Sequence, residues 1–171
     1  MLEQFKPTWM FESIFEVTPA FLKQNQLTTI FTDLDNTLMP WDKSLGDPPR
    51  LRPWLKQMKD SGISVIVVSN NSKKRIAKAI EPLGLKFVSR ALKPTGIGIN
   101  RAIKKWHLNR SEVVMIGDQV LTDVRAANRC GIDCILVKPL VPNDAWNTTI
   151  NRNLERIVWK KVQAKYPEMH W

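Results

Sequence analysis

Short runs of β-branched and other apolar residues recur along the chain, and each run ends at a polar side chain. The clearest runs cover residues 28–33, 63–69, 112–118 and 133–138, and a weaker run covers residues 86–89. Nearly continuous Val and Ile residues are typical of strands that are buried on both faces, as in a parallel sheet. These runs therefore predict five strands of one buried sheet.

Amphipathic patterns fill the intervals between the runs. Apolar residues recur at helical spacing over residues 50–60, 72–83, 95–106 and 121–129. Strands that alternate with helices are typical of βαβ units, because each helix carries the chain back to start the next parallel strand. The pattern predicts an α/β fold with a doubly wound, mainly parallel sheet.

The length favours a single domain over residues 1–171, with a core at 27–140, an N-terminal arm at 1–26 and a C-terminal helical tail at 141–171. The arm contains Trp9, Phe11 and Phe15, which either pack against the core or contact a membrane. The tail predicts a helix over residues 147–165. Its apolar residues are expected on one side: Ile150, Leu154, Ile157, Val158 and Val162.

The amino-acid composition indicates that this core needs no disulfide or structural metal. Hydrophobic residues make up 43% of the chain, which suffices for one buried core. Cys130 and Cys134 have no histidine near them in sequence and are interpreted as buried thiols, which suits a reducing compartment. No leader-like segment and no apolar run near 18 residues stands out, so the expected location is the cytoplasm.

The net charge of +10 comes from one stretch of the chain. Residues 70–110 contain eleven lysines and arginines and one acid, Glu81, whereas acids and bases balance elsewhere. A one-sided basic region suggests an anionic partner, which would be nucleic acid, an acidic membrane surface or a phosphorylated ligand. The alternative is an ordinary solvated face.

Polar residues suited to phosphate chemistry stand at or near the predicted strand ends. They are Asp33, Asp35 and Thr37 after the first strand, Ser69 and Asn70 after the second, Lys93 at the start of a helix, and Asp118 and Asp123 after a later strand. Considered individually, these residues could equally be helix caps, turn residues or a solvated lysine. In a doubly wound sheet, however, the carboxyl ends of the strands line one crevice. We therefore expect these side chains to share a site.

The order of these residues resembles the haloacid dehalogenase (HAD) superfamily, whose motifs run D-x-D-x-T, then Ser or Thr, then Lys, then G-D-x-x-x-x-D. The resemblance covers roughly residues 27–138. The stretches F-T-D-L-D-N-T-L, V-V-S-N-N, A-L-K-P and G-D-Q-V-L-T-D-V are similar to the YqeG-type branch of HAD subfamily IIIA. That branch is similar to phosphatases that convert phosphatidylglycerophosphate to phosphatidylglycerol. The resemblance implies a HAD-like Rossmannoid fold and phosphatase activity.

The residue types suggest a role for each aspartate. Asp33 is the candidate nucleophile, which attacks phosphorus and forms an aspartyl-phosphate. Asp35 is the candidate general acid and base, with a pKa expected to be raised by neighbouring carboxylates. Oxygen ligands favour Mg²⁺, held by Asp33, Asp118 and the backbone carbonyl of Asp35. Asp123 is expected to orient Lys93 or metal-bound water.

The remaining candidates would hold the phosphate. Lys93 is expected to offset the charge of the clustered carboxylates and to bind substrate. Thr37, Ser69 and Asn70 are the other predicted contacts of the phosphoryl oxygens.

The spacing leaves no room for a cap domain. Only 31 residues separate Thr37 from Ser69, and 23 separate Ser69 from Lys93, and both intervals must also supply core elements. An open crevice suits substrates that are too large to enclose, such as a lipid headgroup. The leading hypothesis is hydrolysis of phosphatidylglycerophosphate by an enzyme that is peripheral on the inner membrane face, at an anionic lipid surface. The alternatives are a soluble phosphate ester or nucleic-acid end as substrate, and a basic RNA- or protein-binding module with vestigial activity.

Overall fold

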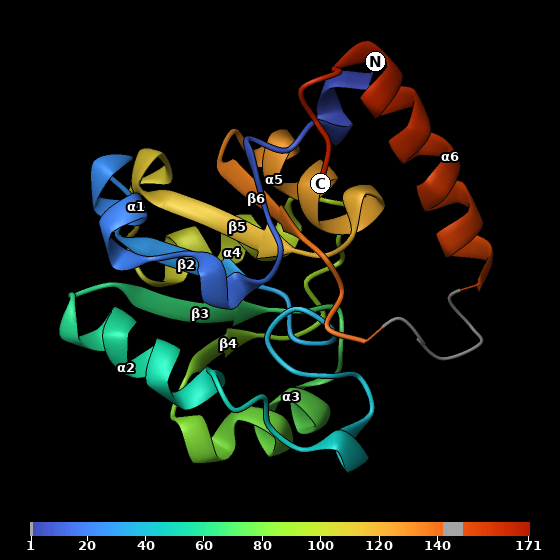
Figure 1. The fold of residues 1–171 in the computed structure, drawn as a ribbon. Helices are drawn as coiled ribbons and strands as arrows, with labels where there is room; N and C mark the ends of the chain where they lie inside the picture. Colours follow the sequence, from blue (N-terminus) through green and yellow to red (C-terminus); the bar gives the residue numbers. More distant parts are fainter. Residues whose placement is uncertain (1, 142–148) are drawn as a thin grey trace.

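The computed structural model describes residues 2–141 and 149–171, and its centre is one six-stranded sheet (Figure 1). All neighbouring strands are parallel, in the order β1-β6-β5-β2-β3-β4. The strands are β1 (Trp9–Phe11), β2 (Thr29–Thr32), β3 (Ser64–Val68), β4 (Lys86–Val88), β5 (Val113–Gly117) and β6 (Asp133–Val137). The predicted α/β class with a parallel sheet is confirmed, and the five predicted strands are present.

The strand β1 was not predicted from the sequence. It is three residues long and lies at the edge of the sheet, where Trp9 pairs with Ile135 of β6. Its three residues are all apolar but only partly buried, and the run is shorter than those of the central strands. The N-terminal arm is therefore part of the sheet.

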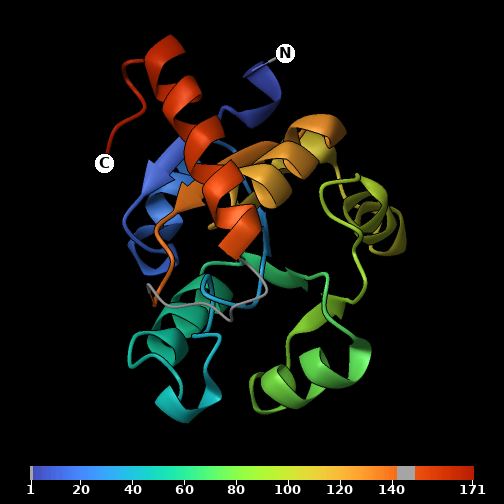
Figure 2. The same ribbon diagram turned by 90° about the vertical axis from the view of Figure 1, so that its right-hand side faces the viewer.

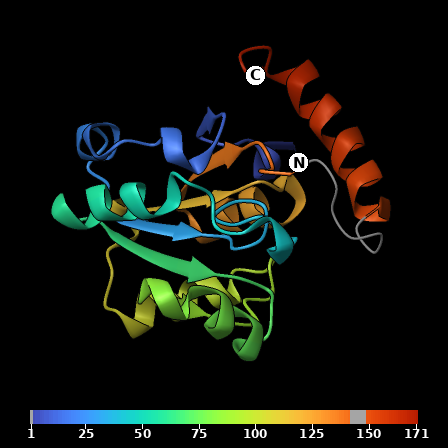
Figure 3. The same cartoon turned by 60° about the horizontal axis from the view of Figure 1, so that its bottom comes forward.

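Helices cover both faces of the sheet, as the doubly wound prediction requires (Figure 3). The helices are α1 (Pro19–Gln24), α2 (Leu51–Asp60), α3 (Lys73–Ile80), α4 (Ile97–Lys105), α5 (Arg125–Cys130) and α6 (Thr149–Lys165). Residues of α1, α2 and α3 form one buried core, and residues of α4 and α5 form the other. Short 3₁₀ turns are Leu2–Phe5, Ile14–Glu16, Lys43–Leu45, Glu81–Leu83 and Arg110–Glu112.

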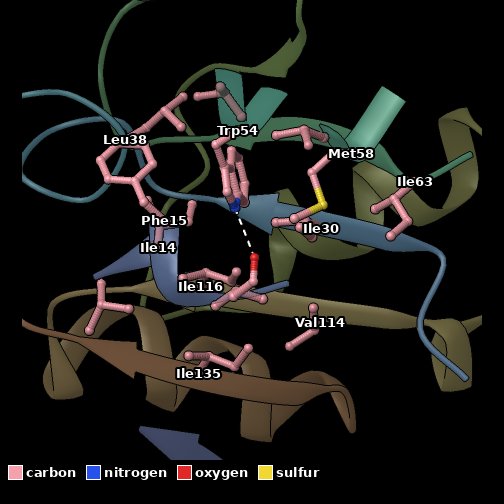
Figure 4. Close-up of a cluster of buried hydrophobic side chains, with 14 of the residues drawn as sticks. Ile14, Phe15, Ile30, Leu38, Trp54, Met58, Ile63, Val114, Ile116 and Ile135 are labelled. Atoms are coloured by element: carbon pink, nitrogen blue, oxygen red, sulfur yellow. Dashed lines mark hydrogen bonds between the residues drawn. The ribbon is translucent and has the colours of Figure 1, made fainter. Parts of the chain in front are cut away.

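Aromatic residues of the arm complete the first of these cores. The ring of Phe15 meets Trp54 of α2 edge-on, with 6.0 Å between the ring centroids. The Trp54 indole nitrogen donates a hydrogen bond to the carbonyl of Val17 over 2.9 Å (Figure 4). Trp9 and Phe11 are partly buried, and both contact Phe21 of α1. Packing against the core therefore accounts for these rings.

The predicted helix over residues 121–129 begins differently in the structure. Val120–Val124 forms one turn of π-helix, and α5 continues from it to Cys130. Single π turns inside helices are frequent at functional sites. Cys130 and Cys134 are buried free thiols, as expected.

The helix α6 lies on the side of the molecule toward which the strand arrows point (Figures 1 and 3). It contacts the turn Leu2–Phe5 and the π turn Val120–Val124. Val162 is buried, but Leu154 and Ile157 are 50% and 53% exposed. The apolar residues expected on one side of the helix are therefore not all buried, because the helix packs against the core through Val158 and Trp159 instead. The side chain of Ile150 lies outside the described residues.

No inserted domain stands between the motifs. The segment from Thr37 to Ser69 contains a loop with one 3₁₀ turn, then α2 and β3, and the segment from Ser69 to Lys93 contains α3 and β4. Among the described helices, none is both long and apolar enough to cross a membrane. The carboxyl ends of the strands are therefore not covered by a cap domain.

Candidate active site

The candidate residues lie at the carboxyl ends of three adjacent strands. Asp33 follows β2, Ser69 follows β3 and Asp118 follows β5, and β2 lies between the other two. A cavity of about 260 Å³ opens at these ends. Its walls are Asp33, Asp35, Asn36, Trp41, Ser69, Asn70, Asn71, Lys93, Gln119 and Thr122.

Three carboxylates gather beside this cavity, and one of them, Asp33, lines it. One oxygen each of Asp33, Asp118 and Asp123 lies within 4.8 Å of the others. The Thr37 hydroxyl donates a hydrogen bond to Asp118 over 2.8 Å, so Thr37 holds this carboxylate. Burial raises the pKa of Asp118 well above its usual range, and the charges of Asp123 and Asp33 add to that shift.

Lys93 is the cation that meets this cluster. Its ammonium group is 2.6 Å from Asp123 and 3.1 Å from Asp33, and its side chain is almost fully buried. Burial alone lowers the pKa of Lys93, but the charges of Asp123 and Asp33 and their hydrogen bonds raise it above its ordinary value. Lys93 therefore stays protonated and offsets part of the negative charge.

Asp123 uses both carboxylate oxygens within the protein. One accepts the hydrogen bond from Lys93, and the other accepts a bond from the backbone N–H of Gln119 over 3.2 Å. Gly117 makes room for it, since a Cβ at that position would lie 2.2 Å from the carboxylate carbon of Asp123. Burial raises the pKa of Asp123 to about 6, against the opposing effect of Lys93. Asp123 thus lies where it can orient Lys93.

Asp35 lines the same cavity, but its hydrogen-bond partners lie outside the acidic cluster. Its two oxygens accept hydrogen bonds from Asn71 over 2.5 Å and from Arg75 over 3.0 Å. Its pKa is raised, as expected, but burial is the main cause and the charge of Asp33 is a smaller one. The expectation that neighbouring carboxylates raise this pKa therefore holds only for Asp33, as a minor cause. The Asp35 carboxylate is not in the acidic group, so only its backbone carbonyl stays a predicted metal ligand.

Ser69 and Asn70 shape the cavity in different ways. The Ser69 hydroxyl accepts a hydrogen bond from the backbone N–H of Asn71 over 3.2 Å. The Asn70 side chain accepts a bond from the backbone N–H of Lys93 over 2.8 Å and donates one to the Lys93 carbonyl over 2.9 Å. Asn70 was predicted to bind substrate, whereas in the structure it fixes the backbone of Lys93.

Several lining residues were not singled out in the sequence. Asn71 directly follows the Ser69-Asn70 pair, and Arg75 lies one helical turn further on, so their position beside the motif was a usable signal. Trp41 comes from the loop after Asp35, and the Arg75 guanidinium lies 5.9 Å from the centroid of its ring. Nothing in the local pattern at Trp41 indicated this contact.

The donor set fits a divalent cation. The clustered groups are carboxylates, which are the oxygen ligands preferred by Mg²⁺ and similar hard cations. Lys93 is engaged with Asp33 and Asp123, whereas the described partner of Asp118 is a hydroxyl group. A cation beside Asp33 and Asp118 would offset the repulsion that raises the pKa of Asp118.

Sequence comparisons identify relatives over nearly the whole chain. A model for haloacid dehalogenase-like hydrolases matches residues 30–92, and a HAD-hydrolase-like model matches residues 91–152. The "Probable phosphatase YqeG" of Bacillus subtilis is 42% identical over 161 residues, which cover 94% of this chain and 93% of that protein.

Solved structures with low sequence identity share the fold. A thermostable NPPase variant from Geobacillus stearothermophilus matches with a TM-score of 0.52 at 15% identity, over 71% of this chain and 93% of that one. The cobalt-bound deoxy-D-mannose-octulosonate 8-phosphate phosphatase from Haemophilus influenzae matches with a TM-score of 0.51 at 18% identity, over 81% and 87%. From the sequence relatives and the motifs together, the chain belongs to the HAD-like hydrolase family and is a HAD-type phosphatase.

Proposed function

We propose that the protein is a Mg²⁺-dependent phosphatase that acts through an aspartyl-phosphate on Asp33, with phosphatidylglycerophosphate as its substrate. The observation that carries this proposal is the contact of Lys93 with Asp33, beside the carboxylate of Asp118. This contact supports the proposal because the proposed nucleophile, a buried cation and the proposed metal ligand lie close together. Bound Mg²⁺ supplies charge neutralisation at the phosphoryl oxygens.

The reaction has two displacements at phosphorus. In the first, a carboxylate oxygen of Asp33 forms a bond to phosphorus while the bond to the ester oxygen breaks, and Asp35 gives its proton to the leaving alkoxide. In the second, water attacks phosphorus and gives a proton to Asp35, and the bond to Asp33 breaks. The products are an alcohol and inorganic phosphate. Burial of Asp35 favours the protonated form that the first step needs.

Lys93 and Ser69 are the proposed contacts of the phosphoryl group. Lys93 presents a fixed positive charge beside Asp33, so it can stabilise the charge that develops as the ester bond breaks. Ser69 lines the cavity at the end of the adjacent strand. Thr37 and Asp123 would act indirectly, by holding Asp118 and Lys93.

The lipid substrate is supported by the sequence resemblance and by the open site. The described residues between the motifs form no cap, so a large headgroup can approach the strand ends. The basic segment 70–110 supports binding to an anionic lipid surface less than its net charge suggests, because three of its basic side chains bind partners within the protein. Lys93 is buried in the site, and Arg75 pairs with Asp35, while Arg110 donates to the carbonyl of Cys130.

The test is a phosphate-release assay across substrates with and without Mg²⁺. We expect release only with a divalent cation, and faster from phosphatidylglycerophosphate in anionic vesicles than from sugar phosphates, nucleotides or phosphorylated oligonucleotides. Asp33→Asn should abolish release, whereas Asp60→Asn, which changes an exposed aspartate, should not. A fully active Asp33→Asn enzyme would reject the nucleophile, and preference for a soluble ester or a nucleic-acid end would reject the lipid. Salt-sensitive RNA binding without hydrolysis of any ester would favour a binding module.

A further inference from the structure

The only acidic residue of α6 contacts the segment that carries Asp118 and Asp123. The helix carries five basic residues and one acid, Glu155. The Glu155 carboxylate accepts hydrogen bonds from the backbone N–H groups of Val120 and Leu121, the latter over 3.0 Å. These contacts join segments that are 35 and 34 residues apart in sequence. Figure 2 shows α6 crossing in front of the helix that Val120 begins.

Glu155 takes the place of a helix cap. Val120 and Leu121 open the helix that runs through the π turn into α5, and the first N–H groups of a helix lack partners within it. A side chain at the preceding position usually accepts one of these bonds. Gln119 holds that position here and makes no such bond. Glu155 therefore supplies the acceptor from a distant helix.

The capped segment carries the acidic cluster. Asp118 stands two residues before Val120, and Asp123 lies inside the π turn. The backbone N–H of Gln119, between them, binds Asp123. Asp123 packs so closely against Gly117 that a Cβ there would clash with its carboxylate. A shift of this segment would therefore move both carboxylates relative to Lys93.

Glu155 is partly buried, so its contact with the π turn is partly shielded from water. Burial raises its pKa to about 7, and the hydrogen bonds from Leu121 and Val120 oppose that shift. Loss of the carboxylate would leave two N–H donors without their acceptor at the start of the π turn.

We propose that Glu155 is a positioning residue, through which α6 holds Asp118 in place as a metal ligand and Asp123 in place as the partner of Lys93. This inference rests on the proposed function, because it acts on the same carboxylates. Glu155 lies beyond residue 152, where the matched family model ends. On this reading α6 is a structural part of the active site and not an appendage.

Other contacts of the same region provide a control. Lys165 of α6 pairs with Glu3, and Glu168, just after the helix, pairs with Lys6. These pairs tie the C-terminal region to the N-terminal turn without touching the π turn. If Glu155 only anchored the helix, loss of Glu168 would have the same consequences as loss of Glu155.

The experiment compares Glu155→Ala, Glu155→Gln and Glu168→Ala in the full chain. Glu155→Ala should raise the Mg²⁺ concentration for half-maximal activity by about tenfold and lower kcat by a similar factor, as found for residues that orient metal ligands. KM for p-nitrophenyl phosphate should change little, because Lys93 and Ser69, the proposed contacts of the phosphoryl group, lie on other segments. Glu155→Gln should recover part of both losses, since its amide oxygen still accepts a hydrogen bond. Glu168→Ala should match the wild type.

Two measurements without substrate separate this inference from the proposed function. Calorimetric titration with Mg²⁺ should give about tenfold weaker binding for Glu155→Ala, and amide exchange at Val120 and Leu121 in the metal-free protein should be faster. Wild-type affinity, kcat and exchange rates in Glu155→Ala would overturn the inference, and so would equal changes in Glu168→Ala. A wild-type protein that releases no phosphate would overturn the proposed function instead, while the exchange rates would still decide the role of Glu155.

Discussion

Replacing Lys93 with methionine removes the cation and keeps most of the side-chain volume. Lys93 is buried between Asp123 and Asp33, at 2.6 and 3.1 Å. Without it, the carboxylates of Asp33, Asp118 and Asp123 share a buried site with no protein cation among the described contacts. The Lys93→Met variant therefore tests whether the charge of the site is balanced as the structure indicates.

The expected cost follows from the separations. Two unit charges 4.8 Å apart, the upper limit within this cluster, repel each other by about 3.5 kcal/mol at an effective dielectric constant of about 20. Protonation of a carboxylate relieves part of this repulsion, and the loss of one partner of a buried ion pair typically costs about 3–5 kcal/mol. For a chain of 171 residues that corresponds to a fall in melting temperature of about 6–20 °C.

The assay is thermal unfolding of Lys93→Met and wild type in chelator, with Lys104→Met as the matched control. Lys104 is an exposed lysine of α4, so its loss should change the melting temperature little. The deficit of Lys93→Met should grow as the pH rises above about 6, the pKa of Asp123 with Lys93 present. Without Lys93 this pKa is higher, so the folded variant still binds a proton that the unfolded chain has lost. Mg²⁺ should raise the melting temperature of Lys93→Met more than that of the wild type.

One result would refute this reasoning. If Lys93→Met unfolded at the temperature of Lys104→Met at every pH, with no larger response to Mg²⁺, the carboxylates would not depend on Lys93 for their charge balance. The proposed pairing of Lys93 with Asp33 and Asp123 would then have to be abandoned.

Two further substitutions test the neighbouring groups. Gly117→Ala places a Cβ 2.2 Å from the Asp123 carboxylate carbon. It should lower the free energy of unfolding by about 1–3 kcal/mol and sharply reduce phosphate release. Unchanged activity would mean that Asp123 needs no fixed position. Asp35→Asn should slow hydrolysis of alkyl phosphates by about 10²–10⁴-fold and that of p-nitrophenyl phosphate far less, because nitrophenolate leaves without a proton, and equal losses would contradict the acid role. In the wild type, the alkyl-phosphate rate should fall as the pH rises through the raised pKa of Asp35.

The core of the fold could be predicted from the sequence because its strands are buried on both faces. The strand β5, for example, is buried at each of its five positions and reads as a continuous apolar run. The edge strand β1 has an apolar run of only three residues. Its place beside β6 depends on a pairing between residues 9 and 135, which no local pattern encodes. The exposure of Leu154 likewise depends on which face of α6 docks, and that is decided by tertiary contacts.

The candidate site, like the fold, could be predicted from the sequence only in part. Residues that follow strands, such as Asp33, Ser69 and Asp118, could be placed together because parallel strands bring their carboxyl ends to one edge. The partners of Asp35 and the role of Glu155 could not, since each is a contact between side chains or helices far apart in the chain. Burial, the main cause of the raised Asp35 pKa, was missed for a related reason. The spacing of motifs along the sequence does not show how deeply a side chain is buried.

A crystal structure with Mg²⁺ and beryllium trifluoride, which mimics a phosphoryl group on a carboxylate, would locate both the nucleophile and the cation. We expect beryllium to be bonded to a carboxylate oxygen of Asp33, with the ammonium group of Lys93 within hydrogen-bond distance of a fluoride and one cation held by Asp33 and Asp118. Beryllium bonded elsewhere, or a cation held away from these two aspartates, would show that Asp33 is not the nucleophile or that the metal site is wrong.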